Sequence, residues 1–400
     1  MVSDVLNNKD RCCGCTACAN ICPQQCIQMS PDEEGFLYPQ INEYRCVGCN
    51  LCDKVCPVKT PFDIPSRKVS TVVVRSKDSD NLRKSTSGGV FKSLAEYVLK
   101  QNGVVCAAAY EENLKVKHLL ITEDEYDDRV LSRIRGSKYV QSNIGDCYFR
   151  IKQYLKLGRQ VLFVGTPCQV SGLKKYLLTE YDNLLTVDLV CHGTPSPKLW
   201  EKYVAFYENK MKSKITAATF RSKKYGYHSG GFMELHFENK KIYRCSGRVD
   251  YMLKSFFEEI CSRPICYDCP FKGINRVSDL TLYDCWHFSN LISGISDDDL
   301  GYTNVVIQSV KGKKYIDLLS NTLEIYNVDT ELAKKLDGPM IDNCPKPHPM
   351  RNEFYKEIDE VSLPEHINKY IPITRKDYYI EWIKKILYSV GVLQRTKSKR

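Results

Sequence analysis

Between residues 70 and 195, short apolar runs typical of buried strands alternate with segments in which apolar residues recur at helical spacing. Apolar runs of strand length are STVVVRS (70–76), GVVCAAAY (103–110), RQVLFVG (159–165) and NLLTVDLV (183–190). Between them, apolar residues recur at helical spacing in GGVFKSLAEYVLKQ (88–101), IGDCYFRIKQYLKLG (144–158) and VSGLKKYLL (170–178). Strands that alternate with helices predict a layered α/β arrangement in this part of the chain.

The pattern changes beyond Pro195. SPKLWEKYVAFYENKMK (196–212) predicts a helix with a good N-terminal cap, and residues 250–261 predict another helix. ITAATFRS, GFMELHFEN and KKIYRCSG, which lie within residues 215–247, predict neighbouring antiparallel strands. Further strands are predicted at DLTLYD (279–284), TNVVIQSV (303–310) and LEIYNV (323–328). The body is therefore predicted to be one mixed α/β unit with an antiparallel insertion.

The composition is that of a soluble chain with an unusual number of cysteines. Of 400 residues, 43% are hydrophobic and 26% are charged. No apolar run approaches the length of about 18 residues that spans a membrane, and the start MVSDVLNNKDRCC has no signal pattern. We therefore expect a cytoplasmic protein. Disulfides are rare in that compartment, so the 20 cysteines indicate metal binding or redox chemistry.

Charge is distributed unevenly along the chain. Residues 1–60 carry five basic and seven acidic side chains, whereas the whole chain has a net charge of +10. A basic body can attract an anionic cofactor, an acidic partner, nucleic acid or an anionic lipid. No recognition module for nucleic acid accompanies the charge, so we expect no nucleic-acid partner.

Two runs of cysteines near the N-terminus have the spacing of a bacterial two-cluster ferredoxin. Each run reads Cys-x2-Cys-x2-Cys-x3-Cys-Pro and binds one cube through three thiolates, while its fourth thiolate reaches the other cube. The first [4Fe–4S] cluster should take Cys12, Cys15, Cys18 and Cys56. The second should take Cys46, Cys49, Cys52 and Cys22. A pair of zinc knuckles is the alternative, and Cys13 and Cys26 lie off the pattern and are interpreted as packing thiols.

Four cysteines of the body stand in unusual contexts. Cys168, in VGTPCQ, and Cys191, in DLVCHGTPSP, each follow a predicted strand, where open α/β sheets place their ligands. Cys266 and Cys269 form a Cys-x2-Cys knuckle. Together they make a plausible four-thiolate site. The alternatives are a redox-active thiol at Cys168, a packing residue at Cys191 and a zinc knuckle.

Six ordered segments resemble one known family. They are STSGGVFKSLA, RGSKYVQS, VLFVGTPCQVSGLK, DLVCHGTPSP, FRSKKYGYH and CYDCPFKGINRVSDLTLYDCWHF. In this order they resemble the beta subunit of coenzyme F420 (deazaflavin) hydrogenases and dehydrogenases, from about residue 70 to 290 and more weakly to 350. The resemblance implies an iron–sulfur flavoprotein with FAD and a [4Fe–4S] cluster in the body. The assignment of that third cluster to Cys168, Cys191, Cys266 and Cys269 rests on their positions.

Two segments fit the phosphates of FAD. Ser87, Gly88 and Gly89 open a helix, whose first-turn N–H groups favour an anion. Arg135, Gly136, Ser137 and Lys138 offer two cations and a hydroxyl. The alternatives are an ordinary serine cap and a solvated basic turn. No catalytic residue is assigned.

Other polar residues in the family segments admit structural interpretations. Arg276 with Asp279, and Asp284 with His287, are interpreted as ion pairs or as groups beside the flavin, the first pair being structural. Tyr283 and Cys285 depart from the glycine and aromatic residue that the family would place around Asp284, which leaves a role for Asp284 in doubt. His192 either donates a hydrogen bond to a cluster sulfur or caps a loop.

The predicted fold class is α+β, a small ferredoxin-like two-cluster domain followed by a mixed α/β flavin-binding body. We expect domains at 1–62 and 70–350 and a helical extension with a basic tail at 351–400. Residues 374–400 are interpreted as a docking helix or as an amphipathic helix on an anionic membrane.

The predicted function is electron transfer between the clusters and FAD, with two-electron or hydride exchange with a small acceptor or donor, deazaflavin-like or other. A redox partner protein is an equally suitable electron source. The alternatives are a non-catalytic electron-transfer subunit of a larger complex and a disulfide reductase that uses Cys168.

Overall fold

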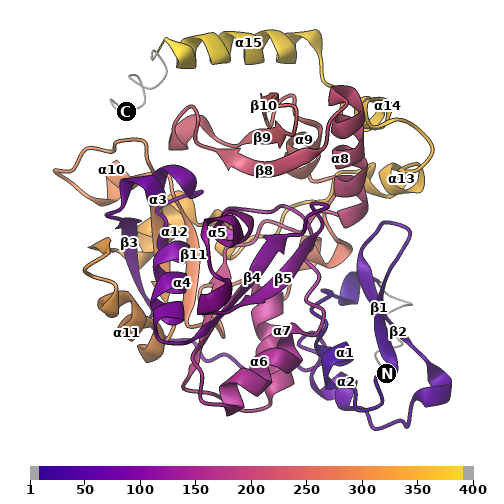
Figure 1. Cartoon of the computed structure of the whole chain (residues 1–400), viewed down its shortest axis with the longest axis vertical. Coiled ribbons are helices and arrows are strands. Elements are labelled where there is room, and N and C mark those ends of the chain that lie inside the picture. The colour runs from indigo at the N-terminus through magenta and orange to yellow at the C-terminus, as the bar shows by residue number, and fades with distance from the viewer. Residues whose placement is uncertain (1–8, 391–400) are drawn as a thin grey trace.

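The computed structural model describes residues 9–390, which form a body with a small module at one side (Figure 1). An eight-stranded sheet is the centre of the body, with the strand order β13-β3-β12-β11-β7-β6-β4-β5. The strands are β3 (Ser70–Ser76), β4 (Val104–Tyr110), β5 (Val116–Ile121), β6 (Val161–Gly165), β7 (Leu184–Leu189), β11 (Leu280–Cys285), β12 (Tyr302–Ile307) and β13 (Leu323–Val328).

Four neighbouring strands of this sheet run parallel. β4 pairs with β6, β6 with β7, and β7 with β11, all in parallel register. β5, β12, β3 and β13 complete the two sides of the sheet through antiparallel pairs. Because parallel strands end at the same edge of a sheet, the loops after β4, β6, β7 and β11 meet there.

Helices cover both faces of the large sheet. On one face, α4 (Val90–Lys100) and α11 (Val310–Leu318) bury Leu94, Val98 and Ile316 against the strands. On the other face, α6 (Cys147–Lys156) and α7 (Pro167–Leu177) bury residues such as Ile151 and Leu173. The shorter helices of the body are α3 (Ser79–Lys84), α5 (Asp128–Ile134), α10 (Phe288–Leu291) and α12 (Thr330–Asp337).

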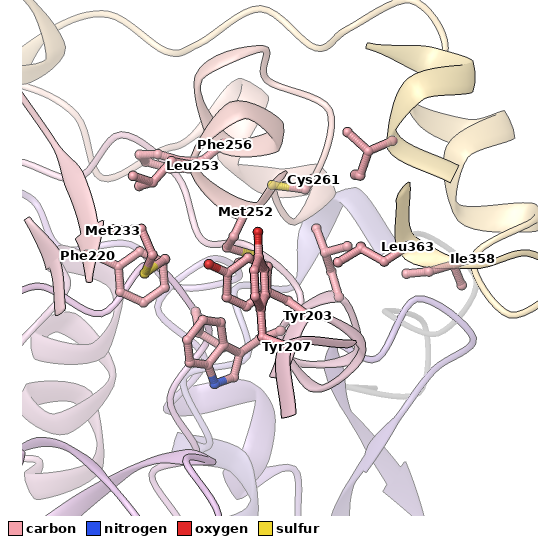
Figure 2. Packing of buried hydrophobic residues seen from close by; sticks show 14 of the residues in the cluster. Tyr203, Tyr207, Phe220, Met233, Met252, Leu253, Phe256, Cys261, Ile358 and Leu363 are labelled. Atoms are coloured by element: carbon pink, nitrogen blue, oxygen red, sulfur yellow. The ribbon is translucent and has the colours of Figure 1, made fainter. Parts of the chain in front are cut away.

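A second layer packs beside the large sheet. β8 (Ile215–Ser222), β9 (Phe232–Phe237) and β10 (Ile242–Ser246) form a three-stranded antiparallel sheet. It packs with α8 (Pro197–Met211), α9 (Tyr251–Phe257), α13 (Arg351–Lys356) and α14 (Leu363–Tyr370). Figure 2 shows this core, in which Tyr203 and Tyr207 of α8 lie between Phe220, Met252 and Leu363. α15 (Arg375–Ser389) lies outermost (Figure 1).

The N-terminal module is a hairpin with two short helices. β1 (Ile27–Pro31) and β2 (Leu37–Ile41) pair antiparallel, and α1 (Ala17–Ile21) and α2 (Leu51–Lys54) follow cysteines of the two runs. Its side chains enter the cores of the body, because Phe36 and Tyr38 pack with α8 and Ala17 packs with α6 and α7. The module is therefore fixed to the body over a wide contact.

The expected fold class is confirmed, since helices and mixed sheets follow a ferredoxin-like region. Each strand and helix predicted in the body is present within a few residues of its expected bounds. The sequence pattern missed β5, and it did not indicate that β11 would join the parallel strands. Within residues 9–390, no helix is long and apolar enough to cross a membrane.

Candidate functional site

The two cysteine runs of the module fold into loops of the same shape. In the first run, Gly14 and Thr16 have φ values of 67° and 69°. At the corresponding positions of the second run, Gly48 and Asn50 have φ values of 67° and 57°. Left-handed residues at the same two positions turn each backbone sharply. The repeat in the sequence is therefore also a repeat in the backbone.

The fourth cysteine of each run lies with the other run. Burial raises the pKa of the Cys18 thiol, and the charges of Cys12 and Cys56 raise that pKa further. A cavity of the module is lined by Cys22 of the first run together with Cys46, Cys49 and Cys52 of the second. These are the two groups that the ferredoxin spacing predicts, and their assignment as ligands stays a prediction.

Two further cysteines of the module lie beside these groups. Cys26 lines the same cavity as Cys22, and the two Sγ atoms are 3.3 Å apart. Cys13 has a pKa well above its usual value, raised first by its hydrogen bond with Cys15, while a hydrogen bond with Cys168 acts in the opposite direction. Both thiols therefore lie beside ligand candidates, and their interpretation as packing thiols stays a prediction.

The turn VGTPCQ presents Cys168 at the carboxyl end of β6. Thr166 caps α7 in a capping box with Gln169, and Pro167 occupies the first turn, where its missing N–H costs nothing. The hydroxyl Oγ1 of Thr166 lies 3.1 Å from the Sγ atom of Cys168. The proline and the cap thus fix the point at which the strand becomes a helix and direct the thiol toward the sheet edge.

A buried series of hydrogen-bonded side chains, Gln169, Ser142 and His118, stabilises this turn. The Nε2 atom of Gln169 donates to the Oγ atom of Ser142 at 2.9 Å, and Ser142 Oγ is 3.1 Å from Nδ1 of His118. Nε2 of His118 is 3.1 Å from the carbonyl of Val164, which can only accept, so Nε2 carries the proton. Burial lowers the pKa of His118 to about 4. The imidazole is therefore neutral and acts as part of the scaffold.

The four body cysteines converge at one place. Cys168 begins α7, Cys191 follows β7, and Cys266 and Cys269 lie in and just after the short 3-10 helix Pro264–Asp268. Burial raises the pKa of Cys269 to about 12, and the nearby charges of Cys168 and Cys191 contribute to that rise. Burial likewise raises the pKa of Cys266, together with Cys191, Cys168 and Cys269. The structure thus places these four cysteines within electrostatic reach of one another, and their assignment as ligands of one cluster stays a prediction.

The surroundings of this group are cationic and contain a fifth thiol. Lys272 donates from Nζ to the carbonyl of Cys191 at 2.8 Å. The backbone N–H of Cys269 donates to the Sγ atom of Cys344 at 3.2 Å. Among residues 9–390, no three His, Cys, Asp or Glu side chains are grouped closely enough to hold a single metal ion. The sequence pattern did not indicate that Cys344 lies beside this group, because Cys344 is 75 residues away from Cys269 along the chain.

Arg263 joins the module to the body cysteines. Its side chain is buried, and its Nε atom donates to the carbonyl of Cys12 at 2.6 Å. Its guanidinium lies 3.9 Å from the centre of the Tyr38 ring, and its Nη2 atom has no hydrogen-bond partner within residues 9–390. The nearby charges of Cys12, Cys13 and Cys266 favour the cation, while burial opposes it. One arginine therefore stands between the first module group and the body group.

Close backbone contact completes this junction. A Cβ atom at Gly172 of α7 would lie 2.8 Å from the Cβ of Cys15 and 2.9 Å from its Sγ. Only glycine allows α7 to approach the module so closely. Farther out, Arg351 of α13 makes a bidentate ion pair with Glu34 of the β1–β2 turn, with bonds of 2.9 and 2.5 Å. These contacts hold the module in addition to the bond from Arg263 to Cys12.

The two segments expected to bind FAD phosphates are neighbours. The N–H of Ser137 donates to Oγ1 of Thr86 at 3.2 Å, which links RGSK to STSGG. Gly89 has a φ of 79° and begins α4, and no side chain caps that helix. The Nε atom of Arg135 is buried without a partner among the described residues. These features leave donors for an anion at the junction of the two segments.

Other predicted phosphate contacts are already used inside the protein. Ser87 Oγ is 2.7 Å from Oγ1 of Thr303, and the N–H of Gly88 donates to the same atom at 2.8 Å. Lys138 donates to the carbonyls of Ile134, Arg135 and Gly136 at the end of α5, and burial lowers its pKa to about 7. Ser87, Gly88 and Lys138 therefore shape the loop in this structure.

The sequence did not single out a polar and aromatic group beside this loop. Lys223 donates to the carbonyls of Leu82 and Ser87, and burial lowers its pKa to about 7. Arg221 pairs with Asp284 and lies 4.8 Å from the centre of the Trp286 ring. In the sequence, Arg221 and Lys223 were marked only by their segment, FRSKKYGYH, which is one of the six that resemble the family.

Two expected pairings are corrected by the structure. Arg276 pairs with Asp188 rather than Asp279, because it turns toward the end of β7. His287 pairs with Asp337 of α12 and not with Asp284. Asp279 accepts from the N–H and hydroxyl of Thr186, a structural role.

The structure shows a partner for one of the two ring nitrogens of His192, and a hydrogen bond from the other nitrogen to a cluster sulfur stays a prediction. Its Nε2 atom bonds to the carboxylate of Glu259, so this nitrogen is not available to a cluster sulfur.

Comparison with known proteins defines the class of the molecule as an iron–sulfur electron-transfer protein. Residues 11–60 match the family model of the 4Fe-4S dicluster domain. Residues 158–331 match the family model for the C terminus of the coenzyme F420 hydrogenase/dehydrogenase beta subunit. These two matches confirm the resemblance seen in the sequence, to a dicluster domain and to the coenzyme F420 hydrogenase/dehydrogenase beta subunit, over the residues that they cover. The four body cysteines lie in the matched range, and the two phosphate segments lie before it.

A solved structure is also similar. It is a chain of the xenon-derivatised F420-reducing [NiFe] hydrogenase complex from Methanosarcina barkeri, with 18% sequence identity and a TM-score of 0.44. The similarity covers 70% of this chain and 91% of that chain. No curated protein matches the sequence.

Proposed function

We propose that the protein is an iron–sulfur flavoprotein oxidoreductase in which the module and body cysteines hold three [4Fe–4S] clusters in sequence, with FAD next to the third. The carrying observation is the junction between module and body: Arg263 of the body donates to the carbonyl of Cys12, and Gly172 of α7 lies against Cys15. A separate ferredoxin domain would not need such contact. The module is therefore built as a fixed part of the electron path.

The chemistry of the body cysteines fits an iron–sulfur cluster. Four thiols from three separate segments converge, and burial and mutual charge raise the pKa of Cys191, Cys266 and Cys269. Such thiols ionise together only around a positive centre, which a metal cluster supplies. Lys272 and Arg263 add positive charge beside the group.

The phosphate segments fit FAD in part. Gly89, the uncapped start of α4 and the unpartnered Nε of Arg135 would face the pyrophosphate. Gly136 and Ser137 would bring the second segment against it, while Ser87, Gly88 and Lys138 would keep the loop in shape.

The cofactors and the protein side chains have different roles in the proposed reaction. Bound clusters exchange single electrons and bound FAD exchanges two with a substrate. The cysteines fix the distances between the redox groups, and Arg263 and Lys272 stabilise their negative charge. A deazaflavin or another small hydride carrier is the proposed substrate class, and the cytoplasm the proposed location.

The two alternatives differ in support. A non-catalytic subunit of a larger complex would keep the cysteine groups and lack flavin turnover. A disulfide reductase needs a thiol with a lowered pKa at Cys168. The hydrogen bond with Cys13, followed by burial, instead raises the pKa of Cys168 well above its usual value. This direction favours a metal ligand over an attacking thiol.

The experiment is a comparison of anaerobically purified wild type, Cys191→Ala and Arg135→Gln. Cys191→Ala should lose the iron of one cluster and keep the signals of the other two. Arg135→Gln should keep its iron and bind FAD at least tenfold more weakly. If Cys191→Ala kept its full iron content, the proposed body cluster would be contradicted. If Arg135→Gln bound FAD as tightly as the wild type, Arg135 would not belong to the FAD site.

A further inference from the structure

α15 presents two different faces. Glu381 and Tyr388 are buried on the inner face, where Glu381 accepts from the N–H of Ser246 at 3.0 Å and Tyr388 stacks on Tyr225 with ring centres 5.3 Å apart. Lys385 donates to the carbonyl of Arg244 on the same side. Figure 1 shows the helix along one edge of the molecule, beyond the three-stranded sheet. The helix is therefore docked by one face only.

The outer face is aromatic. Tyr378, Tyr379, Trp382 and Ile386 are 50%, 61%, 59% and 41% exposed. Helical spacing puts Tyr378, Trp382 and Ile386 on one stripe, with Tyr379 beside it. A soluble protein has no need to expose large rings in succession, and Trp and Tyr are the residues that favour the boundary between water and lipid.

The same segment concentrates positive charge. Residues 375–400 contain eight basic and two acidic side chains, a net charge of +6 out of +10 for the chain. Both acidic residues are engaged with the body, since Asp377 pairs with Arg248 and Glu381 bonds Ser246. Arg375 and Lys376 are exposed and form no ion pair with a described residue. Their charge is therefore available to an external partner.

We propose that α15 is a peripheral membrane-binding helix that lays its aromatic stripe into the surface of an anionic bilayer. A single amphipathic helix binds reversibly, and basic side chains strengthen the attachment to anionic headgroups. A second copy of the chain is a poor occupant, because it would bring a second set of the same basic side chains, such as Arg375 and Lys376, to this helix. The proposal does not depend on the cofactors.

The test is co-sedimentation of the full chain with vesicles of phosphatidylcholine alone and of equal parts phosphatidylcholine and phosphatidylglycerol. We expect binding to the anionic vesicles only, weakened by salt. Trp382 should shift its emission to the blue on binding, and Trp382→Phe should lose that shift while still binding. Equal binding to both vesicles, or no binding, would overturn the proposal.

Two variants and a control separate the contributions. Tyr379→Ser with Trp382→Ser should weaken binding at least tenfold. Arg375→Gln with Lys376→Gln, which leaves the docked face untouched, should weaken it roughly fivefold for each cation removed. Leu157→Ser changes an exposed apolar residue outside α15 and should leave binding unchanged. A concentration-dependent dimer that Trp382→Ser abolishes, or an acidic protein partner in place of lipid binding, would contradict the proposal.

Discussion

His118 is an ionisable group that the fold keeps neutral. It stacks on Phe163 with ring centres 5.4 Å apart, and both ring nitrogens are engaged, one by Val164 and one by Ser142. A second proton would have to go to Nδ1, which accepts in this chain. The geometry of the VGTPCQ turn is thus coupled to the protonation state of a residue outside the site.

This coupling predicts a loss of stability in mild acid. The pKa of His118 is about 4 in the folded protein against 6.5 for an unperturbed histidine, so the unfolded chain binds more protons between these values. The free energy of unfolding should therefore decrease as the pH falls from about 6.5 toward 4, by up to about 3 kcal/mol from this residue. Urea unfolding at several pH values measures it.

The control is His118→Gln, whose amide can donate to Val164 but does not titrate. The difference in unfolding free energy between wild type and this variant should vary with pH below 6.5. A constant difference across that range would show that His118 is protonated in the folded protein.

Arg263 is the second residue whose substitution is informative. Arg263→Lys keeps the charge and loses the planar fork that reaches Cys12 and Gln141 at once. We expect the docking of the module to weaken by about 2 kcal/mol. Trypsin should then cut faster within residues 59–68, between module and body. Arg129→Lys, at an exposed position, should leave the rate unchanged. An unchanged rate in Arg263→Lys would mean that the ring contacts alone hold the module.

At the scale of elements, the β1–β2 turn and α13 are joined by a buried ion pair. The side chains of Glu34 and Arg351 are 13% and 6% exposed. Arg351 also donates to the carbonyl of Ser262, next to Arg263. The C-terminal helices therefore support the junction on which the proposed electron path depends.

Breaking one half of this pair should cost more than removing both. Glu34→Gln leaves Arg351 buried without its counter-charge, and we expect a loss of about 3 kcal/mol in the free energy of unfolding. Glu34→Gln combined with Arg351→Met should lose less than the sum of the two single changes. Urea unfolding of the three variants gives the coupling directly. Additive losses would show that the two residues act independently.

Local elements could be predicted from the sequence, and long-range pairings could not. Cys168 and Cys191 were found because each ends an apolar run, a signal within ten residues. Arg263 contacts Cys12 across 251 positions, and His118 reaches Val164 across 46, with no local pattern to mark either. β5 was missed since its segment, VKHLLI, contains the polar His118 that only the fold explains. Charged neighbours at Arg276 and His287 suggested local pairs, but tertiary packing gave them other partners.

At the scale of the whole molecule, the cysteine groups run from the surface to the sheet. Cys49 of the second module group is exposed, and Tyr44 and Val47 beside it are 103% and 65% exposed. The first module group touches α7, and the body group lies at the ends of β6 and β7. An external electron carrier would therefore meet the chain at the second module group.

This order predicts a selective kinetic defect. Tyr44→Ser with Val47→Ser should lower kcat/KM for a protein electron carrier about tenfold and leave reduction of a small dye unchanged. Leu178→Ser, exposed elsewhere on the body, should affect neither. Equal loss with both acceptors would place the defect inside the protein, and no loss with either would place carrier docking elsewhere.

The central claim is the third cluster at the body cysteines, and counting metal tests it most directly. Iron, acid-labile sulfide, zinc and flavin should be measured per chain in anaerobically purified wild type and Cys168→Ala. We predict about twelve iron, no zinc and one FAD in the wild type, and about eight iron in the variant. About eight iron in both proteins, with one zinc and no flavin in the wild type, would contradict the account.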